Sequence, residues 1–117
     1  MTGINLTECI YKAIDDKKGD NIIVLNMQGV SDIADYCLIC SAGSNVQARA
    51  IADHIDESLG KIGVFPIAQE GYSTGEWILL DYAYCVVHIF IESEREYYDL
   101  EKLWLRAERV DTTNFVS

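Results

Sequence analysis

The sequence is poor in positive charge: 9 Lys and Arg residues stand against 19 Asp and Glu residues, giving a formal net charge of −10. Proteins that bind a nucleic-acid backbone directly use Lys and Arg to neutralise phosphates and release counterions. This shortage therefore argues against direct nucleic-acid binding as the main role. A basic protein surface is a better partner, because opposite charges steer encounter. Acidity that serves solubility alone is an equal alternative.

The chain also lacks the marks of a membrane or secreted protein. No apolar run approaches the roughly 20 residues that a membrane-spanning helix needs. The start of the chain, Met1–Asn5, has neither the basic residues nor the apolar stretch of a signal peptide. We therefore expect a cytoplasmic protein, or an organelle form that is already processed. The 117 residues, half of them hydrophobic, predict one domain over 1–117 that folds without disulfides or a structural metal.

Hydrophobic periodicity and capping signals predict an α/β fold in the order α-β-β-α-β-β-β-α, with helices packed against one mixed sheet of about five strands. Capping-box patterns begin at Asn5, Ser44 and Ser93. The expected helices cover 6–18, 44–60 and a segment after Ser93. The apolar stripe of the second helix includes Val46, Ala50, Ile51, Ile55 and Leu59. That of the third includes Tyr97, Leu100, Trp104 and Ala107. The expected strands cover 21–27, 36–41, 64–68, 77–82 and 85–91, with a mobile loop at 70–76 and a frayed tail at about 111–117.

Cys37 and Cys40 form a CxxC motif, which in other proteins holds a metal ion or a redox disulfide. Here both cysteines fall inside an expected strand, where residues three apart point to opposite faces. The sequence has no second CxxC. Two buried structural thiols are therefore the favoured interpretation, and we expect no metal and no cofactor.

Gly43 and Ser44 lie at an expected strand-to-helix turn, where free N–H groups favour a phosphate. Nucleotidyltransferases carry a Gly-Ser at such a turn, followed by carboxylates that hold metal ions. The nearest acidic pair here, Asp32 and Asp35, precedes the turn instead, so the requirement for metal-assisted phosphoryl transfer is unmet. An ordinary helix cap is the favoured interpretation, and we expect no enzymatic activity.

Strand alternation places Trp77, Leu79 and Asp81 on one face of the expected strand 77–82. An aromatic anchor, an aliphatic neighbour and an orienting charge are what a docking surface needs. From the pattern alone, a Trp77 that covers the core beneath the last helix is an equally good interpretation. His88, in the middle of the next expected strand, is either a semi-buried core residue or a contact residue.

Three segments carry a family resemblance: SDIADYCLICSAGS at 31–44, WILLDY at 77–82 and VVHIF at 86–90. Together with the closing segment, they resemble the Iojap, or ribosomal silencing factor, family. In the closing segment the similarity rests on Arg95, Tyr97, Tyr98, Leu100, Glu101, Leu103 and Trp104. The similarity runs in order from Leu6 to about Val110.

The resemblance implies a homodimer-forming α/β domain, similar in fold to nucleotidyltransferases, that binds ribosomal protein fourteen of the large ribosomal subunit. Occupying that protein blocks subunit joining sterically and lowers translation when nutrients are scarce. By the same resemblance, the docking residues are Trp77, Leu79, Asp81, Tyr82 and His88. Trp77 is then the buried anchor, and Asp81 meets a Lys or Arg of the partner.

Tyr98, Glu101 and Trp104 are further candidates that contact the partner, stabilise the sheet or serve the dimer. Two alternatives remain open. One is a nucleotidyltransferase-like enzyme that uses the Gly43-Ser44 turn. The other is a ribosome-assembly adaptor without silencing activity, which needs the same docking surface.

Ala83 and Tyr84 depart from the family pattern, which usually has Gly-Asp at this point. The change from Gly to Ala predicts either a different turn or an Ala held in a strained conformation. The change from Asp to Tyr removes any contact made by that acid.

Overall fold

The structure is a computed structural model, and it describes residues 3–30, 34–93, 107–113 and 115. These residues form two helices and six strands. In order they are α1 (Gly3–Asp16), β1 (Asp20–Asn26), β2 (Tyr36–Ala42), α2 (Asn45–Gly60), β3 (Ala68–Glu70), β4 (Trp77–Asp81), β5 (Cys85–Ile91) and β6 (Glu108–Arg109). Within these residues, neither helix is long and apolar enough to cross a membrane.

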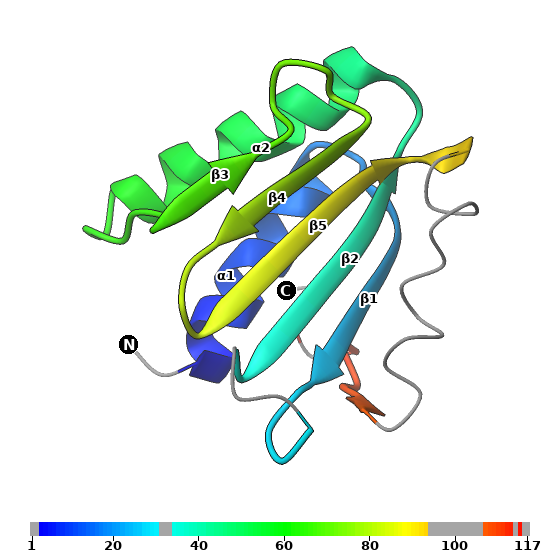
Figure 1. The fold of residues 1–117 in the computed structure, drawn as a ribbon. Helices are drawn as coiled ribbons and strands as arrows, with labels where there is room; N and C mark the ends of the chain where they lie inside the picture. The colour runs from blue at the N-terminus through cyan, green and yellow to red at the C-terminus, as the bar shows by residue number, and fades with distance from the viewer. Residues whose placement is uncertain (1–2, 31–33, 94–106, 114, 116–117) are drawn as a thin grey trace.

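The strands form one mixed sheet in the order β3-β4-β5-β2-β1-β6, with α1 and α2 packed on one face (Figure 1). β2 and β5 pair in parallel at the centre, and every other neighbouring pair is antiparallel. The expected fold class and the order of the first seven elements are confirmed. The sheet has six strands rather than about five, because the two-residue β6 pairs with Leu25 and Asn26 of β1 and leaves no local sequence signal.

The helices bury apolar stripes against the sheet. The largest core cluster joins side chains of both helices to those of the central strands; from α2 it takes Ala48, Ile51, Ala52, Ile55 and Leu59. The expectation that Val46 and Ala50 belong to this stripe is wrong, since Val46 is 71% exposed and Ala50 is also exposed. Both lie two residues from Ala48, which is about 200° around a helix and therefore on the opposite side.

Gln47 links the start of α2 to the end of α1. Ser44 is the N-cap of α2, as expected, and its Oγ accepts a hydrogen bond from the N–H of Gln47 at 3.1 Å. The Gln47 side chain accepts from the N–H of Gly43 and donates to the carbonyl oxygens of Lys17 and Lys18, just beyond α1. The capping pattern is thus used to hold the helix pair together.

Two element boundaries differ from the expectation. Helix α1 begins at Gly3 rather than at about Leu6, so Asn5 lies inside its first turns rather than at its cap. The strand expected at 64–68 is wrong as well: β3 is Ala68–Glu70. Residues 64–67 have a high β propensity but form no strand, because Val64 donates its N–H to the carbonyl of Leu59 at the end of α2. The residues that pair with β4 are 68–70.

The segment expected to be a mobile loop at 70–76 is a turn tied to α2. Three side-chain hydrogen bonds hold it: Asn45 to the carbonyl of Thr74, Arg49 to the carbonyl of Ser73, and Tyr72 to Asp53. Gly71 has a φ of +80°, and a Cβ at this position would lie 1.9 Å from the carbonyl oxygen of Trp77. This close approach requires glycine and fixes where β4 begins.

The segment expected to form the third helix, 94–106, lies outside the described residues. After it, the chain returns to the body of the protein: Val110 donates its N–H to Val24, and Phe115 is 7% exposed with its ring edge-on to Tyr11. Within the tail that was expected to fray, the aromatic ring of Phe115 is buried in the core on the helix side of the sheet.

The turn between β4 and β5 resolves the question that Ala83 raised. Ala83 has a φ of +72°, a left-handed conformation that costs an L-residue roughly 1–2 kcal/mol. The turn is closed by hydrogen bonds from the N–H of Tyr82 to Cys85 and from the N–H of Tyr84 to the carbonyl of Tyr82. Of the two expected outcomes, a strained Ala is the one observed.

Replacing Ala83 by Gly is expected to raise the free energy of unfolding by about 1 kcal/mol, and the thermal midpoint by about 4 °C, because glycine adopts this φ without strain. The same substitution at the exposed helical Ala50 is the control and should cost about 1 kcal/mol. Chemical denaturation measures both, and equal destabilisation by the two changes would contradict strain at Ala83.

Candidate docking face

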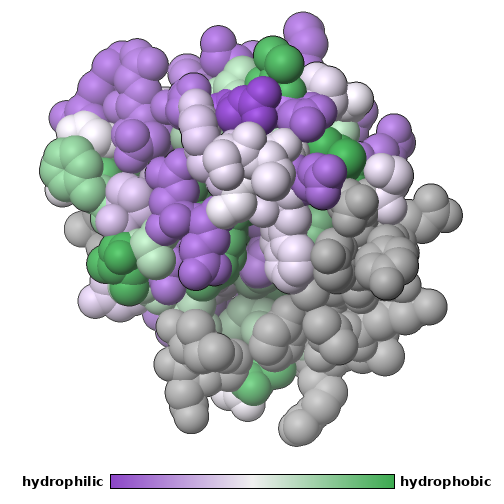
Figure 2. All heavy atoms as spheres, turned by 45° about the horizontal axis from the view of Figure 1, so that its top comes forward, coloured by the Kyte–Doolittle hydropathy of each residue, from purple (hydrophilic) through white to green (hydrophobic). Residues whose placement is uncertain are grey.

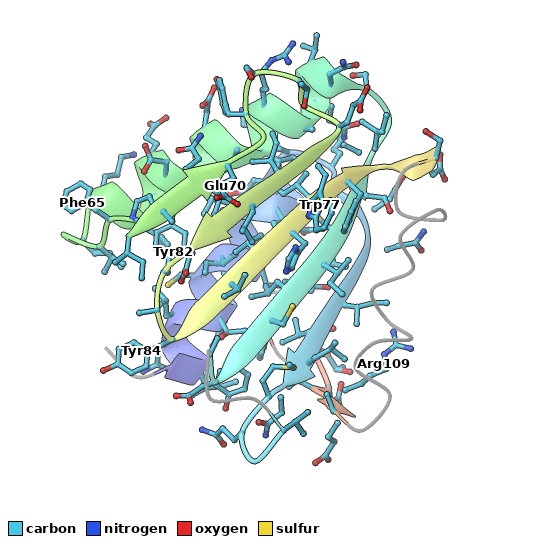
Figure 3. The ribbon with its side chains drawn as sticks, viewed as in Figure 1. Phe65, Glu70, Trp77, Tyr82, Tyr84 and Arg109 are labelled. Carbon is cyan, nitrogen blue, oxygen red and sulfur yellow. The ribbon has the colours of Figure 1, made fainter. Side chains whose placement is uncertain are left out.

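The sheet face opposite α1 and α2 is partly open over β3, β4 and β5. The strand register sets Glu70 beside Leu79 and Leu79 beside His88. The next row sets Ala68, Asp81 and Val86 side by side. We call this surface the docking face; it comprises Ala68, Glu70, Trp77, Leu79, Asp81, Val86 and His88, all partly or fully exposed. Figure 3 shows these strands in front of the helices.

Trp77 is held in place by two neighbours on β5. Its indole Nε1–H donates a hydrogen bond to Nδ1 of His88 at 3.0 Å. Its ring stacks on that of Phe90, with centroids 4.9 Å apart and planes 27° apart. Phe90 itself is fully buried in a second core cluster on this side of the sheet. Trp77 thus both covers that cluster and remains partly exposed, so the two interpretations of its sequence pattern are compatible.

His88 contributes no positive charge to the face at neutral pH. Burial lowers the pKa of its imidazole from 6.5 to about 4. The unprotonated Nδ1 can then accept the indole N–H of Trp77, which a protonated imidazole could not do. His88 therefore acts as a neutral polar residue that orients the tryptophan.

The charges on the docking face are acidic. Asp81 and Glu70 lie on adjacent strands, and the sequence has no Lys or Arg anywhere in 62–93. Asp81 also has a structural role, because its Oδ1 accepts the N–H of Ala83 at 2.8 Å. An apolar centre with acids beside it suits a partner that presents apolar and basic side chains.

Tyr82 does not share a surface with the other expected docking residues. Its side chain lies on the helix side of the sheet, 4% exposed, within the largest core cluster. Burial and the nearby charge of Asp56 raise the pKa of its phenol above the usual value. Its hydroxyl has no hydrogen-bond partner among the described residues. Strand alternation explains this placement, because residue 82 has the opposite parity to 77, 79 and 81.

Of the remaining expected contact residues, Tyr98, Glu101 and Trp104 lie outside the described part of the chain, whereas three residues of the docking face were missed from the sequence. Val86 was within reach, since it alternates with His88 along one strand. Glu70 was not, because the strand was expected to end at residue 68, and Ala68 was not, because its register against β4 is a tertiary property.

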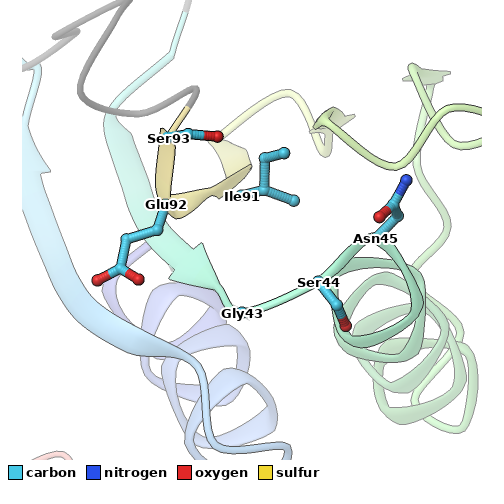
Figure 4. Close-up of a pocket in the computed structure, with 6 residues that line it drawn as sticks. All are labelled: Gly43, Ser44, Asn45, Ile91, Glu92 and Ser93. Atoms are coloured by element: carbon cyan, nitrogen blue, oxygen red, sulfur yellow. The ribbon is translucent and has the colours of Figure 1, made fainter.

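The Gly43-Ser44 turn forms an open pocket, lined by Gly43, Ser44, Asn45, Ile91, Glu92 and Ser93 (Figure 4). Its features do not favour a phosphate. The charged side chain among these six residues is the acid Glu92. The N–H of Gly43 and that of Gln47 are already bound by side chains at the cap. The turn is therefore used as the helix cap that its sequence predicted.

The CxxC pair lies on opposite faces of β2, as expected. Cys40 belongs to the helix-side cluster and Cys37 to the second cluster. Burial, with a smaller effect of Cys85, raises the pKa of the Cys37 thiol to about 12, which makes it a poor nucleophile. Burial likewise raises the pKa of Cys85, whose Sγ lies 2.9 Å from the hydroxyl of Thr7, to about 11. These are structural thiols.

Comparison with known proteins places the chain among ribosomal silencing factors. The family model described as "Ribosomal silencing factor during starvation" matches residues 2–117. The chain is 39% identical to ribosomal silencing factor RsfS of Halalkalibacterium halodurans over the whole of both chains. It is 42% identical to that of Bacillus subtilis, over 85% of this chain and 84% of the relative. It also superimposes on the crystal structure of protein CV0518 from Chromobacterium violaceum with a TM-score of 0.87 and 32% identity, covering 89% of this chain and 87% of that one.

Replacing Tyr82 by Phe is expected to raise the free energy of unfolding by about 1 kcal/mol, because it removes a buried hydroxyl that has no partner among the described residues. Thermal unfolding measures the change. A loss of more than about 1 kcal/mol would show that the hydroxyl is hydrogen-bonded after all.

Acidification is expected to destabilise the protein through His88. Its pKa in the folded protein, about 4, lies below the ordinary histidine value of 6.5, so the unfolded chain binds the proton first as the pH falls. Stability present above pH 6.5 is lost progressively down to about pH 4, by roughly 3 kcal/mol in total. Denaturant titrations at pH 7.5 and 4.5 should show this loss in the wild type.

The His88→Gln variant is the control for the acid titration. Glutamine has a carbonyl oxygen that can accept the indole N–H, and it does not titrate. The pH dependence of its stability should be smaller than that of the wild type by roughly 2–3 kcal/mol over the same interval. Identical pH dependence in the two proteins would show that His88 is not the titrating group.

Proposed function

Because this chain belongs to the ribosomal silencing factor family, we propose that it binds the large ribosomal subunit through ribosomal protein fourteen and blocks subunit joining. By occupying the surface that the small subunit must approach, it represses translation during starvation. The match of the family model to residues 2–117 is the observation that carries this proposal. The effect is steric and needs no catalytic step. We further propose that the free protein is a homodimer.

The docking face is the surface that we propose for ribosomal protein fourteen. Leu79 and Trp77 supply its apolar centre, and Trp77 is oriented in advance by His88. A side chain held before binding loses little conformational entropy on binding, which favours affinity. Asp81 and Glu70 attract Lys or Arg side chains of the basic ribosomal protein.

The overall charge supports the same partner. A net charge of −10 is repelled by ribosomal RNA but attracted to basic ribosomal protein. Binding should therefore weaken as ionic strength rises, since salt screens charges that are exposed to solvent. An assembly adaptor would use the same face, and the two roles are separated by whether the chain prevents joining of mature subunits.

Replacing Asp81 by Asn tests the electrostatic part of this proposal. Asn keeps a side-chain oxygen that can accept the N–H of Ala83, so the turn is preserved while the charge is removed. We expect the dissociation constant for purified large subunits to rise roughly threefold to tenfold at low salt. Co-sedimentation over a salt series measures it, and the difference from the wild type should shrink at high salt.

Asp56→Asn is the matched control, because it makes the same change of charge on the exposed surface of α2, behind the sheet. It should bind within about twofold of the wild type.

In parallel, Leu79→Ala should weaken binding and restore the monosome peak when the protein is added to separated subunits in a sucrose gradient. Full silencing by both Leu79→Ala and Asp81→Asn would refute the docking face.

A further inference from the structure

Tyr84 is a large aromatic residue exposed at one end of the docking face. Its side chain is 58% exposed and projects from the turn between β4 and β5 (Figure 3). Among the described residues, other large hydrophobic side chains are exposed singly or on the segment after α2: Ile4, Val46, Ile62, Phe65 and Ile67. Among the coloured residues in Figure 2, hydrophilic side chains likewise predominate and hydrophobic ones are scattered. Of these, Ile67 also lies beside Asp81, whose carbonyl accepts its N–H; Tyr84 differs in being an aromatic residue on the turn that the Asp81 carboxylate closes.

The backbone beneath Tyr84 is fixed by hydrogen bonds on both sides. Its carbonyl oxygen accepts the N–H groups of Asp35 and Tyr36, each at 3.0 Å. Its own N–H donates to the carbonyl of Tyr82 at 2.9 Å. The preceding residue, Ala83, is held in a left-handed conformation with its N–H bound to Asp81. A solvated aromatic ring thus stands on a turn that keeps one strained shape.

Strain of this kind is maintained only where the surroundings enforce it, and it is concentrated at binding and switching sites. A rigid base also lowers the entropy lost when the side chain is immobilised by a partner. Tyrosine is among the residues that contribute most to protein interfaces. These features favour a contact role for Tyr84 over an incidental exposed ring.

The chemistry around Tyr84 favours a cationic side chain as its ligand. The carboxylate of Asp81 lies within this turn, where its Oδ1 accepts the N–H of Ala83, the residue before Tyr84. No Lys or Arg occurs in 62–93, so this stretch supplies no cation of its own to neutralise Asp81. The face of an aromatic ring attracts an ammonium or guanidinium group, and adjacent carboxylates reinforce that attraction.

We propose that Tyr84 extends the docking face and binds an arginine or lysine side chain of the basic partner against its ring. This inference rests on the proposed function, whose partner is a basic protein of the large subunit. A second copy of the chain fits the same position poorly, because each copy carries a net charge of −10 and would bring further acids to the acidic docking face.

Two substitutions at Tyr84 separate the ring from its hydroxyl. Tyr84→Phe keeps the aromatic face, whereas Tyr84→Leu keeps apolar bulk without it. We expect Tyr84→Leu to raise the dissociation constant for large subunits by about threefold to thirtyfold, and Tyr84→Phe to remain within about twofold of the wild type. The hydrogen bonds of Tyr84 given above are made by its backbone, so both variants should unfold within about 2 °C of the wild type.

Phe65→Leu is the matched control, since Phe65 is 67% exposed and lies on the segment between α2 and β3. It should leave the affinity for large subunits unchanged. If Phe65→Leu lowered the affinity for large subunits as much as Tyr84→Leu does, the proposal would be overturned, because the loss would then reflect nonspecific hydrophobic binding. A Tyr84→Phe loss equal to that of Tyr84→Leu would also overturn it, because the hydroxyl would then be the contact.

Failure of this inference is distinguishable from failure of the proposed function. If Asp81→Asn weakens binding and Tyr84→Leu does not, the docking face stands and the role of Tyr84 is refuted. If Tyr84→Leu alters the oligomeric state in analytical ultracentrifugation without altering affinity, the ring contacts a second copy and the inference is again refuted. If the wild-type protein does not co-sediment with large subunits, both fail together.

Discussion

The antiparallel register of β4 against β5 is the constraint on which the docking face depends. It sets Trp77 opposite Phe90 and Leu79 opposite His88. A slip of β4 by one residue would carry Trp77 and Leu79 to the helix side, because successive residues of a strand point to opposite faces. The register is secured at one end by the hydrogen bond from the N–H of Ile91 to the carbonyl of Glu76, one residue before Trp77. At the other end it is secured by the turn at Ala83.

The two faces of the sheet differ in how far they are buried. The helix side is a continuous apolar core, formed by α1, α2 and alternate residues of the central strands. The opposite side has a smaller buried cluster around Phe90, and β3, β4 and the outer part of β5 remain partly open beside it. Trp77 lies at the boundary between the buried and open parts. It is therefore rigid because it packs on the core, and accessible because it is at the edge of that core.

Neutral and acidic groups are arranged so that this open surface attracts positive charge. Burial keeps His88 uncharged, so it fixes the indole without opposing a cation. Asp81 combines two roles through one carboxylate: an oxygen holds the strained turn, and the charge remains at the surface. Shape and electrostatics at this end of the sheet are thereby coupled, since the acid that would attract a basic partner also maintains the backbone under Tyr84.

The sequence by itself determined the fold class, the order of the first seven elements, the split of Cys37 and Cys40 between two faces, and the shared face of Trp77, Leu79 and Asp81. Those properties follow from local periodicity and capping, which a single segment carries in full. Only the tertiary structure decided that Glu70 and Ala68 join that face and that residues 64–67 are not a strand. Each of these depends on which strand lies alongside, and pairing between distant segments is set by the packing of the whole sheet.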